Sequence, residues 1–177
     1  MALTDGLVFY LPLWSRSLQG SPIVSKDIYA HSCAITGATW GVQGRTLDGS
    51  TDLITTNSAA AGSVLNITGS MTILAWIYPH SVSGNQLIVA RWNEGAAKYT
   101  YFLNLAGSQL EWVHSNGAGD DLMLSAVSSV VANTFQQVGA VRNGSNVIGF
   151  VNGAQKLSPA QTVTPLAQSF ATTIGSR

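Results

Sequence analysis

The sequence predicts an all-β fold in which two antiparallel sheets pack face to face. From Met71 onward, short runs of alternating apolar and polar residues recur at a spacing of about 8–12 residues, which is typical of β-sandwiches and barrels. Pairs of Asn and Gly separate several of these runs, as in tight hairpins. Apart from a helical turn that residues 58–63 could hold, no segment shows a 3.6-residue apolar period.

The N-terminal part predicts three strands. Residues 7–14 form a continuous apolar run in which Pro12, which has no amide hydrogen, suits an edge or a strand end. A polar loop follows to about Ser32. Residues 35–40 and 44–54 are the next two expected strands, with a turn at Gly41.

The C-terminal part predicts a regular series of strands at residues 71–78, 86–92, 99–105, 110–115, 122–125, 135–141, 147–151 and 170–174. Asn143-Gly144 and Asn152-Gly153 lie between strands, and we expect a type I′ hairpin at each because Asn and Gly tolerate positive φ. Since neither a linker nor an internal repeat appears, we expect a single domain over residues 1–177.

The chain is uncharged overall and poor in charge. Its 8 basic and 8 acidic residues cancel, and charged residues are only 9% of the total, against about 25% in ordinary domains. This surface favours neutral partners such as glycans or protein, not nucleic acid. No apolar run reaches the roughly 18 residues of a membrane span. The start of the chain lacks the basic residues of a secretory signal. Either an export signal has been removed or the protein never needed one, as in phage structural proteins, and we expect an extracellular or virion-surface location.

Several segments together resemble a known family. They are residues 6–13, 27–31, 37–40, 45–54, 72–77, 135–141, 149–153 and the pair Ile174-Gly175. In this order and spacing they resemble the laminin-G-like branch of the concanavalin A-like lectin/glucanase superfamily. The resemblance implies a jelly-roll β-sandwich, with Leu47 replacing the usual aromatic residue of one motif.

The resemblance also implies a closing strand that this sequence lacks. Family members normally continue beyond the Ile-Gly pair with a strand that lies beside the opening strand, whereas the sequence given stops at Arg177. An unpaired strand edge is a template for another chain. Assembly through an open edge, as a homo-oligomer or within a virion, is therefore one expectation, and a shortened chain is the other.

The positions of the acidic residues bear first on catalysis. Glycosidases of the superfamily need paired carboxylates about 5–5.5 Å apart, but Glu111 has no acidic residue two or four positions away, and Asp120 and Asp121 are adjacent. We therefore expect that the protein is not an enzyme.

Calcium binding is a second possibility. Related domains often bind calcium, and Asp27 matches their first-loop ligand. The alternative is that Asp27 caps a turn while His31 packs against Tyr29.

The segment from Trp92 to Tyr99 is the expected sugar site. Trp92, Asn93, Glu94 and Tyr99 offer the aromatic faces, amide and carboxylate by which proteins bind sugars. The alternative is that Trp92 ends its strand inside the core and that residues 93–95 form only a turn.

The other tryptophans and the only cysteine are expected to be structural. We expect Trp76 and Trp40 to pack in the core or between the sheets. Trp112 belongs either to the core, which we favour, or to a concave groove, and Cys33 is expected to be a small buried hydrophobe.

The sequence thus supports three hypotheses. The first is a non-catalytic, carbohydrate-binding or adhesion module that binds glycans through its end loops. The second is a structural β-sandwich protein of a virion, such as a capsid decoration or tail component of a phage. The third, a glycoside hydrolase, is disfavoured because paired carboxylates are absent.

Overall fold

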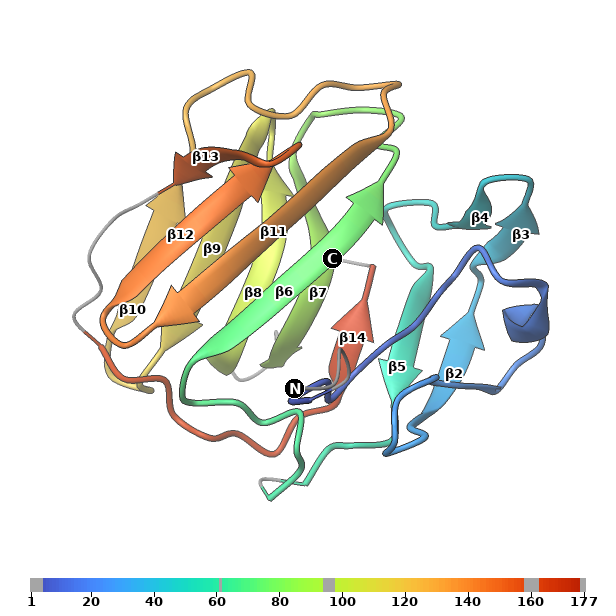
Figure 1. Ribbon diagram of the computed structural model, residues 1–177, viewed down its shortest axis with the longest axis horizontal. Helices are drawn as coiled ribbons and strands as arrows, with labels where there is room; N and C mark the ends of the chain where they lie inside the picture. The colour runs from blue at the N-terminus through green and yellow to red at the C-terminus, as the bar shows by residue number, and fades with distance from the viewer. Residues whose placement is uncertain (1–4, 61, 94–97, 158–162, 176–177) are drawn as a thin grey trace.

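The computed structural model describes residues 5–60, 62–93, 98–157 and 163–175, and it confirms an all-β sandwich of two antiparallel sheets (Figure 1). In the large sheet the strands lie in the order β1 (Ile23–Val24), β2 (Ser32–Thr36), β5 (Leu53–Thr56), β14 (Thr172–Ile174), β7 (Asn85–Asn93), β8 (Lys98–Ala106), β9 (Gln109–Ser115) and β10 (Asp120–Leu124). The small sheet lies in front of it in Figure 1, in the order β13 (Ala154–Leu157), β12 (Asn146–Val151), β11 (Gln136–Asn143) and β6 (Met71–Ile77).

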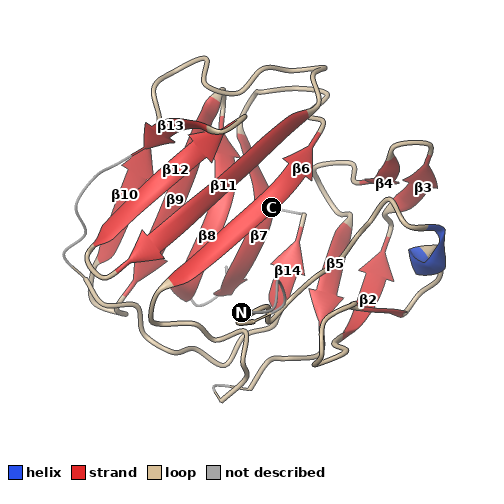
Figure 2. Cartoon of the chain, viewed as in Figure 1, coloured by secondary structure: helices blue, strands red, loops and turns tan. Residues whose placement is uncertain are grey.

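Two minor elements accompany the sheets. A separate hairpin consists of β3 (Thr39–Gly41) and β4 (Gly44–Thr46), and a single 3₁₀ turn, η1, spans Arg16–Leu18. The distribution of strands and loops is seen in Figure 2.

Every strand predicted beyond residue 71 has a counterpart within about two residues of its predicted ends. The short strand β13 was not predicted, because three of its four side chains are exposed and it shows no apolar alternation. The type I′ turn is confirmed at Asn152-Gly153, where φ is 50° and 76°. The type I′ prediction is wrong at Asn143-Gly144. There Asn143 pairs with Asn146, and of the two turn residues between them Gly144 alone has a positive φ.

The N-terminal predictions are partly wrong. Residues 7–14 form no strand, although Phe9, Leu11 and Leu13 pack against a buried cluster. The predicted strand 35–40 is divided by a turn at Gly37, where φ is 72°.

The predicted strand 44–54 is also divided. Residues 47–52 form a loop in which Asp48 accepts hydrogen bonds from the amides of Asp52, Ser50 and Thr51, at 2.9 Å each. These bonds, led by the one from Asp52, lower the pKa of Asp48 to about 2.

Apolar side chains fill the space between the sheets in two clusters. The first joins the inner faces of β8, β9, β11 and β12, and Trp112 lies in it with 0% exposure, which confirms the core position that we favoured. The second contains Leu18, Ile23, Cys33 and Ile54. Cys33 is buried as predicted, and burial raises the pKa of its thiol to about 11.

The prediction that Trp76 packs in the core is wrong. On β6, Met71, Ile73, Ala75 and Ile77 pack against the core, so Trp76 points outward, 62% exposed. Its ring stacks on Phe135 with centroids 5.5 Å apart. The two-sheet sandwich forms without it.

Trp40 does not pack between the two sheets either. It lies on β3, half-buried, with the Arg45 guanidinium 5.6 Å from the centre of its ring.

Candidate functional site

The strands β7 to β10 present one face to the core and the other away from it, although Asn104, Glu111 and Val113 on this second face are each 8% exposed or less. Tyr101, Leu103 and Trp112 belong to the core cluster, so the residues that alternate with them face outward. The register aligns these outward side chains across neighbouring strands. We call the following residues the outer patch: Trp92, Phe102, Asn104, Glu111, Val113 and Leu122.

Two aromatic rings form one end of the outer patch. Trp92, near the end of β7, lies with its ring centroid 6.1 Å from that of Phe102 on β8, at an interplanar angle of 40°. Both side chains are partly exposed. Trp92 therefore lies on the outer side of the sheet and not in the core between the sheets.

The other predicted sugar-site residues are only partly described. Asn93 ends β7 and pairs with Lys98, and Tyr99 on β8 pairs with Trp92. The side chains of Asn93 and Tyr99, and all of Glu94, lie outside the described part of the molecule. The strand register thus brings the backbones of Trp92 and Tyr99 together, and the sugar site itself stays a prediction.

Glu111 is the acidic member of the outer patch. It lies on β9 between Asn104 of β8 and Leu124 of β10, and it is only 8% exposed. Among the described residues, its carboxylate has neither a hydrogen bond nor an ion pair. In the sequence Glu111 stands out only as half of a missing catalytic pair, because its neighbours on the sheet come from other strands.

Asn104 adds a second polar group beside Glu111. Its side-chain amide donates to the carbonyl of Leu105 at 3.2 Å, whereas its Oδ1 atom is fully buried and has no partner in the described structure. Buried polar atoms are usually hydrogen-bonded. Asn104 and Glu111 are therefore unusual, because each has a side-chain oxygen without a partner among the described residues. Asn104 could not be singled out from the sequence alone.

Beneath the outer patch, His114 belongs to a buried polar network. Its Nδ1 atom accepts a hydrogen bond from the Trp112 indole at 3.1 Å, and its Nε2 atom lies 3.0 Å from the carbonyl of Val163 and 3.5 Å from Asp121 Oδ2. Burial lowers the pKa of His114, because an imidazolium here would lose its hydration. Asp120 and Asp121 point to opposite faces, as their adjacency predicted.

Asp27 is engaged by backbone amides. Its two carboxylate oxygens accept hydrogen bonds from Tyr29 at 2.9 Å and Tyr10 at 3.0 Å. Burial alone would raise its pKa, but hydrogen bonds from Ser25, Tyr10 and Tyr29 outweigh that effect and lower it. His31 stacks on Tyr29 with centroids 5.8 Å apart. Both contacts match the alternative to a metal ligand.

The described residues contain no group of three or more His, Cys, Asp or Glu side chains that could hold a metal ion. Donors from backbone carbonyls, which calcium also uses, are not covered by that finding. Calcium binding at Asp27 therefore stays a prediction.

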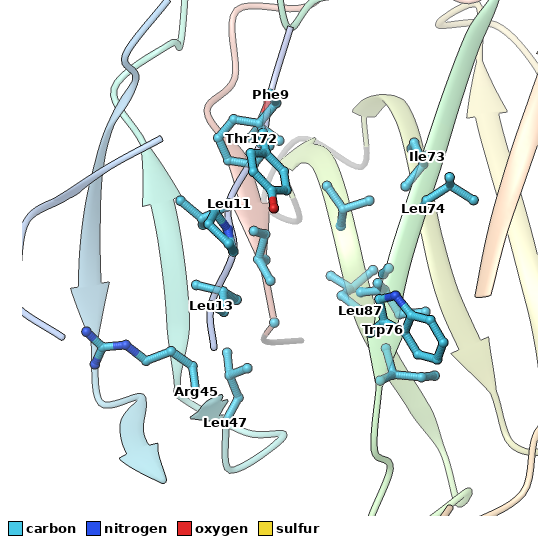
Figure 3. A pocket seen from close by; sticks show the side chains of 18 of the residues that line it. Phe9, Leu11, Leu13, Arg45, Leu47, Ile73, Leu74, Trp76, Leu87 and Thr172 are labelled. Carbon is cyan, nitrogen blue, oxygen red and sulfur yellow. The ribbon is translucent and has the colours of Figure 1, made fainter. Parts of the chain in front are cut away.

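A pocket of about 540 Å³ lies at a distinct place, between β6 and residues 7–14. Figure 3 shows Phe9, Leu11 and Leu13 on one side of it, with Ile73 and Trp76 on the other. Strands β7, β8 and β14 also contribute lining residues. The sequence did not predict this pocket, because it forms between segments more than 50 residues apart.

The pocket borders an open sheet edge and is nearly uncharged. In the described part of the chain, β6 pairs with β11 on one side and with no strand on the other. Of the Lys, Arg, Asp and Glu residues that the structure describes, only Arg45 lines the pocket, and its guanidinium donates to the carbonyls of Leu18, Gln19, Gly20 and Ala38.

The sequence matches the family model of the concanavalin A-like lectin/glucanases superfamily over residues 48–177, and the chain belongs to this superfamily. No curated protein sequence matches it. Within the described residues, no helix has the length and apolar character that crossing a membrane requires.

Solved structures share the fold at low sequence identity. The binding domain of botulinum neurotoxin serotype D/C is 13% identical, with a TM-score of 0.72, and the match covers 98% of this chain and 44% of that one. A structure of botulinum neurotoxin type C, described as depending on two ganglioside molecules for cell entry, is 12% identical with a TM-score of 0.61, covering 86% and 39%.

A third similar structure is a domain shorter than the two neurotoxin chains. The CBM40 domain of the Ruminococcus gnavus IT-sialidase is 11% identical, with a TM-score of 0.53, covering 62% of this chain and 65% of that one. This chain thus spans less than half of the two neurotoxin chains and about two thirds of the CBM40 domain.

Proposed function

We propose that the chain is a non-catalytic carbohydrate-binding module that contacts its ligand through the outer patch. The observation that carries this proposal is the pair of partly exposed rings, Trp92 and Phe102, on the outer side of β7 and β8 beside Glu111. Aromatic faces pack against the apolar faces of sugar rings, while carboxylates and amides take the hydroxyl groups.

The similar structures support a glycan ligand. One is described as dependent on two ganglioside molecules, and another is a CBM40 domain of a sialidase. At identities of 11–12% these likenesses concern the fold, so the ligand of this chain is argued from its own outer patch.

Binding without hydrolysis fits the placement of the described carboxylates. Glu111 and Asp120 share the outer face of the large sheet, and Asp120 pairs with Ser115. Ser115 lies four positions along the strand from Glu111, which is about 13 Å. Glycosidases place their two carboxylates about 5–5.5 Å apart when they retain configuration, or roughly 6.5–9.5 Å apart when they invert it.

A glycan array probed with the purified chain tests this function. We expect binding by the wild type, and loss of binding with retained folding in Trp92→Ala. Repeating the array with a chelator tests the calcium site that we propose at Asp27, since binding that needs calcium would then disappear. Absence of binding to every glycan of a broad array would contradict the carbohydrate-binding proposal.

A second function, assembly within a virion or another protein complex, is favoured by one separate observation. The open edge of β6 lies beside an apolar pocket, and exposed edges pair with strands of other chains. Size-exclusion chromatography with light scattering tests self-assembly. Oligomers are expected at high concentration, and a monomer throughout would contradict it. An extracellular or virion-surface location belongs with either function.

A further inference from the structure

The surroundings of Glu111 are apolar or uncharged. In the register, its cross-strand neighbours are Asn104 and Leu124, and the outward residues on either side of it along its own strand are Gln109, whose amide donates to the carbonyl of Ser125, and Val113. Arg91, on the same sheet, faces inward, and its guanidinium donates to carbonyls of Ser58, Ala59, Ala60 and Gln168. Among the described residues, no positive charge compensates the Glu111 carboxylate.

The carboxylate is nevertheless reachable. The fully buried polar atoms without a partner include Asn104 Oδ1 but neither oxygen of Glu111, so water still touches this carboxylate. A ligand resting on Trp92 and Phe102 would displace that water. Because a desolvated carboxylate without donors is costly, such a ligand must supply hydrogen-bond donors itself.

We propose that Glu111 makes the outer patch selective for glycans that present hydroxyl or amino donors and carry no negative charge. This inference rests on the carbohydrate-binding function proposed above and adds the ligand class to it. A ligand carboxylate or sulfate placed beside Glu111 would face a like charge where water no longer screens it. An amino sugar would gain a charge-assisted hydrogen bond instead.

Affinities for matched glycan pairs test this selectivity. Lactose and sialyllactose differ by one acidic sugar, and a chitin trisaccharide and its deacetylated form differ by their amino groups. For the wild type we expect the acidic member to bind at least about tenfold more weakly than its neutral partner. The deacetylated trisaccharide is expected to bind at least as tightly as the acetylated one.

Glu111→Gln removes the charge and keeps the size of the side chain, so we expect it to reduce the difference between lactose and sialyllactose to less than about threefold. Asp120→Asn is the matched control. It removes a charge from the same face about 13 Å along the strand, beyond the Debye length of roughly 8 Å, and the difference should persist.

The outcomes separate the two proposals. The selectivity would be overturned if neutral and acidic glycans bound with equal affinity, or if Glu111→Gln left the difference between lactose and sialyllactose unchanged. The carbohydrate-binding function would stand in both cases. Absence of binding to every member of the panel would overturn both.

Discussion

The two sheets differ in what they present to the outside. The outer patch of the large sheet combines two aromatic rings, the amide of Asn104 and a carboxylate, 8% exposed, that has no partner among the described residues. The outer face of the small sheet beside its open edge is apolar, with Leu74 at 63%, Trp76 at 62% and Phe135 at 50% exposure. The first surface suits a ligand rich in hydroxyl groups, whereas the second suits another protein.

Aromatic residues alone therefore do not identify a sugar site. Trp76 and Trp92 are both tryptophans near the surface, and each lies beside a phenylalanine. The patch of Trp92 includes a carboxylate, that of Glu111, whereas the cross-strand partner of Trp76 is the uncharged Gln137. The following predictions test that contrast, beginning with the largest expected effect.

The tryptophan in the core should matter far more for stability than the exposed one. Trp112→Ala removes a fully buried ring, and we expect a loss of about 3–5 kcal/mol in the free energy of unfolding. Trp76→Ala should cost no more than about 1 kcal/mol. Urea denaturation of both variants measures this. Trp112→Phe serves if the alanine variant does not fold, and equal losses would contradict the assignment of the two faces.

Glycan affinity should depend on the outer patch and not on the small sheet. Trp92→Ala is expected to weaken binding about tenfold or more, since an aromatic contact contributes roughly 0.5–1.5 kcal/mol beyond the area that it buries. Trp76→Ala is the matched control and should bind like the wild type. Isothermal titration calorimetry measures both. Equal weakening by the two substitutions would remove the distinction between the surfaces.

Stability should decrease at acidic pH because of His114, which lies beneath the outer patch. Its pKa is lowered in the folded state, so the unfolded chain binds more protons below the ordinary value of about 6.5. Its contribution is complete above that value and is lost as pH falls through the folded-state pKa.

His114→Asn tests the cause, because its Oδ1 atom is intended to accept the Trp112 hydrogen bond without titrating. Urea unfolding between about pH 7.5 and 5 should show a smaller loss of stability in this variant than in the wild type. An equal loss of stability in the variant and the wild type would exclude His114 as the cause.

Charges on the outer face of β6 should reduce any self-association. Leu74→Lys and Trp76→Lys place an ammonium group on exposed positions beside the open edge, a device by which natural sheets avoid pairing. Light scattering should show smaller oligomers, while glycan affinity stays unchanged. Oligomers that resist both substitutions would show that this face is not the interface.

The sequence predicted strands better than the direction of their side chains. On β6 both sets of alternating residues are largely apolar, so alternation did not show whether Trp76 or Ile73 faces the core. Residues 7–14 look like a strand because Phe9, Leu11 and Leu13 are apolar, yet they pack against the second core cluster without joining a sheet. Apolar character indicates burial and leaves the pairing open.

The candidate site could be predicted only in part. Trp92 was recognised from its own segment, but Glu111 gains its setting from Asn104 on β8 and Leu124 on β10. Cross-strand register depends on packing across the whole sheet, and a single sequence does not record it. Turn chemistry was more accessible, since Asn152 and Gly153 both adopt the positive φ that their types favour.

Backbone amide chemical shifts during titration with a bound glycan test the central claim most directly. We predict that the shifts concentrate on β7, β8 and β9 around Trp92, Phe102 and Glu111. Shifts confined to β6 and residues 7–14 would place the ligand in the apolar pocket instead and would contradict the account.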